Sequence, residues 1–204
     1  MLLSNGYRLN IMENKSVFKL VKFSDSIDLS NFYIEADKRG FKNNSSRKML
    51  IDSIASEREW QVWILYHDDK IVGTTAAHSF DEMGNNSYRI AVRSCAFTDM
   101  MPIKRLRTRT GIIEHQHVSP QFFMTAGIEW AGKDKEFYIT SNKNSWGTQQ
   151  RVHRTWAPTL AKTGCLENCG EIFYRGVNQT VWKVNVGVFY SQLEQYGRWP
   201  IELS

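Results

Sequence analysis

The sequence predicts an α/β protein whose central sheet is mixed and mostly antiparallel, with helices on both faces. The first observation is the order of elements: a strand and two helices precede a meander of strands, and helices and strands then alternate. The second is the absence of a Rossmann glycine fingerprint and of a Walker loop. The third is the composition, since 204 residues of which 42% are hydrophobic suit one globular domain. We expect a single domain over residues 17–204, preceded by a flexible leader at 1–16.

The first half of the chain predicts two helices and several strands. The helix over residues 26–40 has Ser26 or Asp28 as its N-cap, and Gly40 ends it in a left-handed turn. The other elements are a strand at 17–23, a helix from Ser45 or Ser46 to about Glu57 that buries Leu50 and Ile54, a hairpin at 60–80 that turns at Asp68 and Asp69, a loop at 81–86 and a strand at 88–97.

The second half predicts a basic loop followed by alternating strands and helices. Pro158 interrupts or kinks the helix over residues 145–164, and Gly164 ends it. The elements are a loop at 99–110 with Lys104, Arg105, Arg107 and Arg109, a strand at 111–118, a helix from Pro120 to about Ala131, a strand at 136–142, the helix at 145–164, and strands near 170–176 and 179–186. Residues 187–204 give no clear pattern.

The junction between the strand at 111–118 and the next helix is the strongest candidate for a ligand site. Ser119 is a preferred N-cap, and Pro120 suits the first helical position. The helix is apolar nearly all round, which predicts burial. The N-terminus of a helix carries free N–H groups and the positive end of the dipole, so this junction suits a phosphate or another anion.

The predicted order of elements and this junction together resemble the GNAT N-acetyltransferase superfamily. Its pyrophosphate motif is Gln/Arg-x-x-Gly-x-Gly/Ala, and this sequence offers Gln121-Phe122-Phe123-Met124-Thr125-Ala126. The first and last marked positions agree, whereas Met124 stands at the central glycine. The alternative, Thr108-x-x-Gly111-x-Ile113, has the glycine and lacks both ends.

The resemblance implies acetyl-CoA or another acyl-CoA as co-substrate and a set of residues that hold it. The implied cofactor contacts are Val118, Ser119, Gln121 and Phe122 at the junction, Arg107 and Arg109 as counter-charge, and Asn142 or Asn144 after the next strand.

The resemblance also implies a mechanism of direct attack. A general base takes a proton from an amine, the amine attacks the thioester carbonyl, and a backbone N–H stabilises the oxyanion. Glu114 has the place of the base, provided that it faces the cleft; His115 and His117 then point to the opposite face. Leu160 holds the place of the family's tyrosine acid, so His153 or a water substitutes for it.

Three alternatives remain at this stage. A degenerate protein of the same fold, kept as a binding or assembly module, agrees with Met124 and with the missing tyrosine. In an acyl transferase that uses an acyl carrier protein, the basic loop would dock an acidic carrier. A nucleic-acid-binding protein would stack bases on Tyr88, Trp146 and Trp156, although 21 acidic residues dilute the positive charge and argue against nucleic acid as a partner.

The remaining expectations concern partners and location. The acceptor is a small-molecule or peptide amine, and a homodimer is compatible with the sequence. A net charge of +5 permits an anionic partner without requiring one. His115-x-His117 has no third ligand at a recognisable spacing, so we expect no metal. With no signal peptide, no membrane span and three cysteines read as reduced thiols, we expect a cytoplasmic protein.

Overall fold

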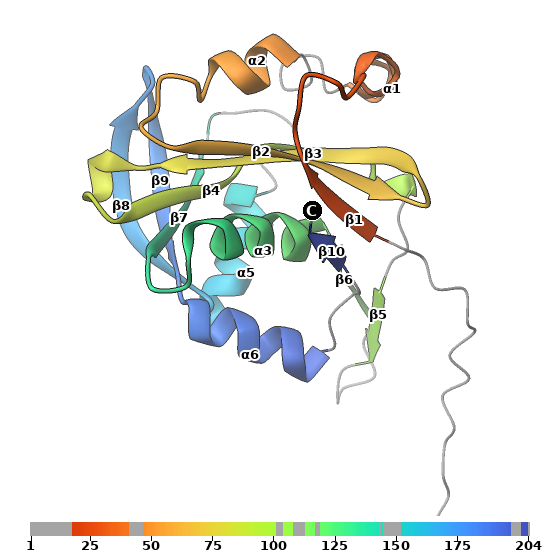
Figure 1. Ribbon diagram of the computed structural model, residues 1–204. Helices are drawn as coiled ribbons and strands as arrows, with labels where there is room; N and C mark the ends of the chain where they lie inside the picture. The colour runs from red at the N-terminus through yellow and green to blue at the C-terminus, as the bar shows by residue number, and fades with distance from the viewer. Residues whose placement is uncertain are drawn as a thin grey trace, which may run out of the picture.

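The computed structural model describes residues 18–40, 47–100, 104–107, 113–116, 119–142, 144, 152–196 and 201–203. In this part of the chain an eight-stranded sheet lies between two layers of helices (Figure 1). The strands are β1 Phe18–Lys22, β2 Trp60–His67, β3 Lys70–Ser79, β4 Ser87–Ala96, β5 Lys104–Arg107, β6 Ile113–Gln116, β7 Glu136–Ser141, β8 Leu166–Tyr174, β9 Val177–Val184 and β10 Ile201–Leu203. The helices are α1 Ser30–Lys38, α2 Arg47–Asp52, α3 Ser119–Ala131, α5 Ala157–Lys162 and α6 Val186–Tyr196, with 3₁₀ turns η1 Asp81–Met83 and η2 Thr98–Met100 and a π-helical segment η3 Val152–Trp156.

The strand order confirms the predicted mixed, mostly antiparallel sheet. It runs β10-β1-β2-β3-β4-β7-β9-β8, and the parallel pairs are β1 with β10 and β4 with β7. The other neighbours pair antiparallel, including the hairpins β2–β3 and β8–β9. Strands β5 and β6 pair with each other in a separate two-stranded sheet.

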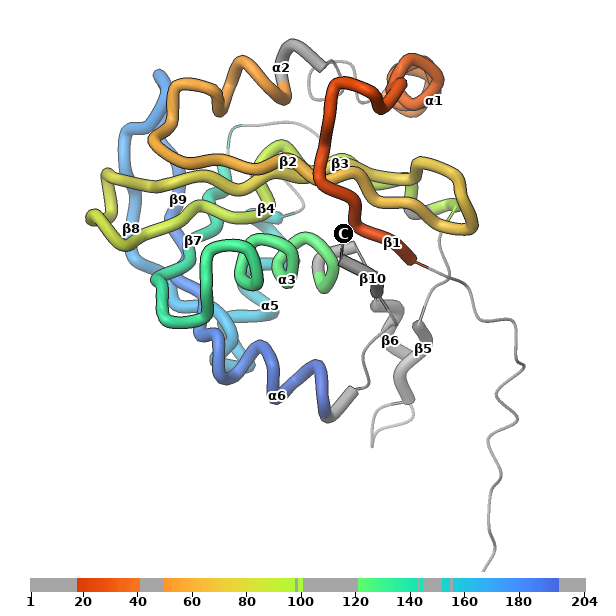
Figure 2. Tube along the Cα trace, in the orientation of Figure 1, coloured from red at the N-terminus to blue at the C-terminus, as the bar shows by residue number. Residues whose placement is uncertain are grey.

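Helices cover both faces, as predicted. In Figure 1, α1 and α2 lie above the sheet, and α3, α5 and α6 lie below it. Above the sheet, Leu29, Leu50 and Ile54 pack with strand residues such as Ile64 and Val92. Below it, most of α3 is buried against the sheet, and Phe189 of α6 belongs to the same core. The Cα trace in Figure 2 shows α3 between the sheet and α6.

The ends of several helices follow from local sequence. Gly40 and Gly164 have φ angles of 81° and 75° and lie directly after α1 and α5, as predicted. The predicted start of α1 at Ser26 or Asp28 was wrong, because this helix begins at Ser30 with Leu29 as its N-cap; the Asp28 carboxylate still accepts a hydrogen bond of 2.9 Å from the Ser30 amide. Near Pro158 the helix is irregular but not broken: the π-helical segment ends at Trp156, whose backbone is helical, and α5 begins at Ala157.

Four other predictions about elements were wrong or incomplete. The loop at 99–110 contains strand β5, because Lys104–Arg107 pairs with Ile113–Gln116. Helix α2 ends at Asp52 instead of reaching Glu57, and turns carry Ile54 into the core. β8 starts at Leu166, earlier than predicted, and the C-terminal region supplies α6 and β10.

Helix α3 packs unusually close to β4. A Cβ added at Gly127 would lie 2.5 Å from Ile90 Cγ2, which is shorter than any ordinary contact. Glycine at this position therefore allows the helix to approach the strand. None of the helices in the described part of the chain has both the length and the apolar character needed to cross a membrane.

Candidate functional site

Strands β4 and β7 run parallel, pair at their beginnings and then separate. The pairing joins Ser87–Arg89 to Glu136–Tyr138 and stops at Arg89, although β4 continues to Ala96. Within the described sheet, β3 is the other neighbour of β4. The β7-facing edge of β4 beyond Arg89 therefore has no strand partner among the described residues and opens at the carboxyl ends of two parallel strands, which is where open α/β sheets bind ligands. We call this edge the β4 slot.

The backbone of β4 is irregular along this slot. Ala91 and Arg93 have φ angles of 54° and 49°, which non-glycine residues seldom adopt. The register with β3 shifts between Thr74 and Ala76 and again between Ala76 and His78. Bulges of this kind leave backbone groups outside the ladder and occur often beside active sites.

The first turns of α3 lie beside the end of β4. A Cβ added at Gly73, which pairs with Ala96, would lie 2.9 Å from the Cys95 carbonyl oxygen and 3.3 Å from Phe123 Cζ. The first amides of a helix have no acceptor within the helix, so they suit an anion. Met124, which stands where the GNAT motif has its glycine, is 1% exposed and points into the core.

A chain of hydrogen bonds fixes His153 at the far end of β7. The indole Nε1 of Trp182 donates to Ser141 Oγ at 3.0 Å, and Ser141 Oγ lies 3.1 Å from His153 Nδ1. Ser141 is fully buried, whereas His153 is partly exposed in the π-helical segment η3. Rare π-helical turns are frequent at functional sites.

A second group of polar side chains lies on the α1/α2 side of the sheet, where β4 and β7 begin to separate. The guanidinium of Arg89 donates to Gln179 Oε1 at 3.1 Å and lies 5.0 Å from the centre of the Tyr174 ring. Gln179 Oε1 also accepts from Thr140 of β7 at 2.6 Å. Gln179 thus links β4 and β7 at this point.

Among the described residues, Glu57 supplies the carboxylate that contacts this group. It ion-pairs with Arg175, accepts a hydrogen bond of 3.1 Å from the Tyr174 hydroxyl, and lies 3.9 Å from His78 Nδ1. Burial lowers the pKa of Arg89 to about 10, with Arg175 and Arg93 lowering it and Tyr174 acting in the opposite direction. Arg89 is therefore charged at neutral pH.

His78 in the same group is neutral. It is fully buried, and its Nδ1 lies 2.5 Å from the Ser79 carbonyl oxygen, which can only accept. Nδ1 therefore carries the proton. Burial and then the charge of Arg89 lower the pKa of His78 to about 4. Its Nε2 is buried without a hydrogen-bond partner among the residues described.

The predicted site residues fall into two sets. Of those described with side chains, Asn142 and His153 lie at or near the end of β7, and Asn142 Oδ1 accepts a hydrogen bond of 2.8 Å from the exposed Asn144. Phe122 is 0% exposed and packs on Phe18, so its side chain is part of the core. Gln121 is partly exposed in the first turn of α3.

For the other predicted site residues, the structure describes either the backbone alone or no part of the residue. Glu114 and Arg107 belong to the β5–β6 hairpin and Ser119 opens α3, whereas Val118 and Arg109 lie outside the described residues. The strand of the central sheet that leads toward α3 is β4 rather than β6. Its sequence, SYRIAVRSCA, has no carboxylate, so the base role of Glu114 stays a prediction without the support of sheet position.

The sequence analysis missed the group around Arg89. Arg89 and Arg93 interrupt an otherwise apolar strand, and their neighbours Tyr88 and Ile90 belong to the core beneath the sheet. An arginine placed between two such residues on a central strand was the signal that could have drawn attention to it.

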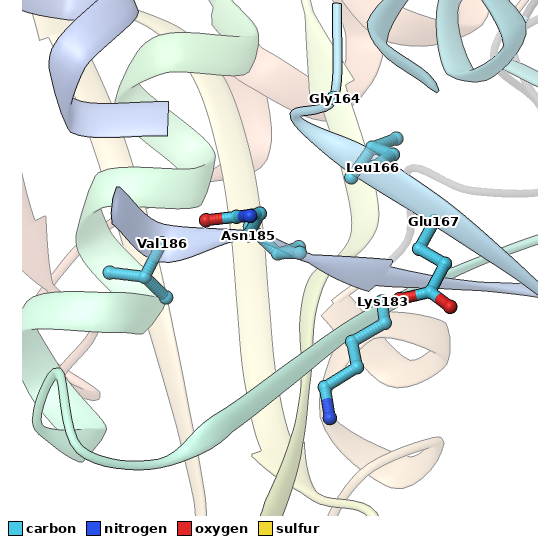
Figure 3. A pocket seen from close by; sticks show the side chains of 7 residues that line it. Gly164, Leu166, Glu167, Lys183, Asn185 and Val186 are labelled. Atoms are coloured by element: carbon cyan, nitrogen blue, oxygen red, sulfur yellow. The ribbon is translucent and has the colours of Figure 1, made fainter. Parts of the chain in front are cut away.

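A separate pocket of about 500 Å³ lies at the opposite end of the sheet (Figure 3). Its lining comes from the start of β8 and the end of β9, with Gly164, Leu166, Glu167, Lys183, Val184, Asn185 and Val186. Lys183 ion-pairs at 2.6 Å with Glu136, the first residue of β7. The pocket is thus at the paired end of β7, away from the β4 slot.

No known family model matches the sequence, and no curated protein sequence matches it. Solved structures do. FeeM, an N-acyl amino acid synthase from uncultured soil microbes, matches with a TM-score of 0.50 at 9% identity, over 89% of this chain and 98% of that chain. A GNAT family acetyltransferase from Elizabethkingia anophelis, solved with acetyl-CoA bound, matches with a TM-score of 0.46 at 11% identity, over 82% and 97%. An acyl-CoA N-acyltransferase from Pseudomonas aeruginosa matches with 0.46 at 8% identity, over 83% and 99%.

At such low identity these matches bear on architecture alone. The match with FeeM spans most of this chain and almost the whole of the other. The chain therefore has a GNAT-like fold, that of the acyl-CoA N-acyltransferases.

Proposed function

We propose that the protein is an acyl-CoA-dependent N-acyltransferase that moves an acetyl or another acyl group to an amine by direct attack. The observation that carries this proposal is the β4 slot, the unpaired edge of β4 beyond Arg89. FeeM, which has a similar fold, is an N-acyl amino acid synthase, and this is consistent with an amine acceptor on this fold.

The slot suits the donor because the pantetheine arm of coenzyme A is extended and carries amide groups. An exposed strand edge binds such a chain as it binds an added strand, through its backbone N–H and C=O groups. The thioester then lies along β4, and the pyrophosphate reaches the first turn of α3 near Ser119, Gln121 and the Phe122 amide. Val118, Arg107, Arg109, Asn142 and Asn144 complete the proposed contacts with the donor.

In the proposed reaction the acceptor amine attacks the thioester carbonyl, and a base takes the proton that the amine loses. A backbone N–H of the irregular stretch at Ala91–Arg93 stabilises the oxyanion. The C–S bond then breaks, and the departing thiolate takes a proton from His153, which Ser141 holds in place. Glu114 is the proposed base.

Donor binding is tested by thermal unfolding with acetyl-CoA, free CoA or buffer. At about 100 times the dissociation constant, a ligand that binds only the native state adds about 2.7 kcal/mol, which raises the midpoint by about 5–10 °C for a chain of this size. No shift with either ligand would reject acyl-CoA as donor and favour the degenerate module. Turnover with an acyl carrier protein thioester but not with acyl-CoA would identify the carrier-dependent alternative.

The two proposed proton-transfer groups are tested separately. Glu114→Gln should keep the thermal shift with CoA and lower turnover by about 10² or more, and an unchanged rate would dismiss Glu114 as the base. His153→Ala should lower turnover with acetyl-CoA by about 10², and much less with a thioester whose thiol is more acidic, because that thiolate leaves without a proton. An equal loss with both thioesters would contradict the acid role.

A further inference from the structure

We infer that Arg89 binds a carboxylate of the acceptor, so that the acceptor is an amino acid or a similar small molecule with a carboxylate next to its reacting amine. This inference rests on the proposed function and names its substrate class.

The position of Arg89 in β4 places its side chain beside the β4 slot. Arg89 is the last residue of β4 that pairs with β7, so it stands where the β4 slot begins. Its neighbours Tyr88 and Ile90 face the core on the α3 side, and its own side chain contacts Gln179 and Tyr174 on the other side. A group bound by Arg89 would therefore lie beside the proposed thioester, on the face away from α3.

The charged side chains described around Arg89 are more positive than negative. The guanidinium groups of Arg89 and Arg175 both lie over the Tyr174 ring, and the carboxylate of Glu57, which contacts this group in the described part of the chain, ion-pairs with Arg175. His78, opposite Arg89 in the sheet, is neutral. The described part of the chain thus has an excess of positive charge at the start of the slot.

Arg89 has no carboxylate partner among the described residues. Arg39, Arg58 and Arg175 each form an ion pair with a carboxylate, but Arg89 forms none with any residue described. Its guanidinium has five N–H donors, and the described partners of these donors, Gln179 at 3.1 Å and the Tyr174 hydroxyl, are both uncharged. Because a largely buried charge without a counter-ion is unfavourable, an anionic ligand would stabilise this arrangement.

The chemistry of the guanidinium group restricts the class of ligand further, to a carboxylate. Its planar fork binds a carboxylate through two parallel hydrogen bonds, which an ammonium or an amide does not reproduce. Gln179 and the Tyr174 ring hold the guanidinium in place from two sides. Arg89 would thereby fix the carboxylate and leave the adjacent amine directed toward the thioester.

The test compares amino acids with their carboxamides, which keep the side chain and an α-amine and replace the carboxylate by a neutral group; rates are compared at a pH where both amines are largely deprotonated. Leucine, phenylalanine and glutamine are measured against leucinamide, phenylalaninamide and glutaminamide, with acetyl-CoA as donor and release of free CoA thiol as readout. We expect at least one acid to be preferred over its amide by about 10–100-fold in kcat/KM, as for loss of a hydrogen-bonded charge pair. Arg89→Met should reduce that ratio to near 1.

Two variants control for charge and folding. Lys133→Met removes one positive charge from the exposed end of α3 and should keep the preference of the wild type. Arg89→Lys retains the charge without the fork and should keep most of the thermal stability while losing most of the preference. Both Arg89 variants should bind acetyl-CoA within about twofold of the wild type.

The outcomes separate this inference from the proposed function. Equal use of acids and amides by the wild type, or an unchanged preference in Arg89→Met, would overturn the role of Arg89 while leaving acyl transfer intact. If acetyl-CoA neither binds nor reacts, calorimetric titration with the same acids and amides decides whether Arg89 binds a carboxylate. Binding of an acid that Arg89→Met abolishes supports the carboxylate site, and binding of none of the acids overturns it.

Discussion

At the scale of single residues, His78 and Arg89 lie opposite each other on β3 and β4, in a region that excludes most water. The neutral imidazole donates through Nδ1 to the Ser79 carbonyl, and its low pKa of about 4 reflects burial first and the positive charge of Arg89 second. The fold therefore depends on an uncharged histidine at this position, which makes its stability dependent on pH.

We predict that stability falls on mild acidification because of His78. Its folded pKa of about 4 lies below the unfolded value of 6.5, so in this interval the unfolded chain binds a proton that the folded chain does not. The contribution is present above about pH 6.5 and is lost as the pH falls toward 4. Chemical denaturation should show a loss of about 2 kcal/mol between about pH 7.5 and pH 5.

The variant His78→Gln isolates this effect from other titrations. It should be less dependent on pH over the same interval, whatever its stability at neutral pH, because it has no imidazole to protonate. The same acid-induced loss in His78→Gln and in the wild type would show that other groups cause it.

Cysteine reactivity is a second prediction at this scale. Burial raises the pKa of Cys95 to about 12 and that of Cys165 to about 11, whereas Cys169 is exposed on β8. Because the thiolate is the reactive form, iodoacetamide should modify Cys169 alone in the native protein and all three cysteines in denaturant. Mass spectrometry reads the result, and rapid native modification of Cys95 or Cys165 would contradict their placement in the core.

At the scale of elements, the contact between α3 and β4 sets the geometry of the slot. Gly127→Ala places a methyl group 2.5 Å from Ile90 Cγ2, so the helix must move or the isoleucine must give way. Alanine in a helix gains up to about 1 kcal/mol over glycine, but overpacking in a core typically loses about 1–3 kcal/mol. We expect a net loss of about 1–2 kcal/mol in the free energy of unfolding.

The matched control is Gly187→Ala in the first turn of α6. A Cβ there would lie 3.6 Å from Asn185 Oδ1, which is an ordinary contact, so this variant should be neutral or slightly more stable. Equal stability of the two alanine variants would contradict the close packing of α3 on β4.

Elements with strong local signals could be predicted from the sequence. The Ser119-Pro120 pair and the apolar run after it predict a helix from Pro120 to about Ala131, and α3 spans Ser119–Ala131. The start of α6 has a weaker sequence signal, which is the N-cap Asn185. Its Oδ1 accepts a hydrogen bond of 3.1 Å from the Val188 amide. An asparagine N-cap before β-branched and aromatic residues is easily read as the end of a strand.

Pairing between distant segments could not be predicted in this way. The alternation at 111–118 correctly indicates a strand, but alternation does not say which strand is its partner. β6 pairs with β5 outside the central sheet, so the inference that it leads the sheet into α3 failed. The group around Arg89 was missed for the same reason, since it is assembled from β3, β4, β7, β8, β9 and the residue Glu57.

At the scale of the whole molecule, the parallel pair β4–β7 joins two halves of the sheet, in which every neighbouring pair except β1–β10 is antiparallel. The half β10-β1-β2-β3-β4 is covered by α1 and α2 above, and the half β7-β9-β8 follows after the separation (Figure 1). The β4 slot, the start of α3, His153 and Arg89 all lie where these halves part. The sheet topology rather than any sequence motif brings them together.

The most direct test of this account is amide hydrogen exchange of the native protein with and without acetyl-CoA. If the donor pairs with the unpaired edge of β4, amides in residues 90–96 should exchange several-fold more slowly in its presence, and those in the middle of β2 should be unchanged. Acetyl-CoA that binds and protects other segments while leaving residues 90–96 unaffected would contradict the proposed site.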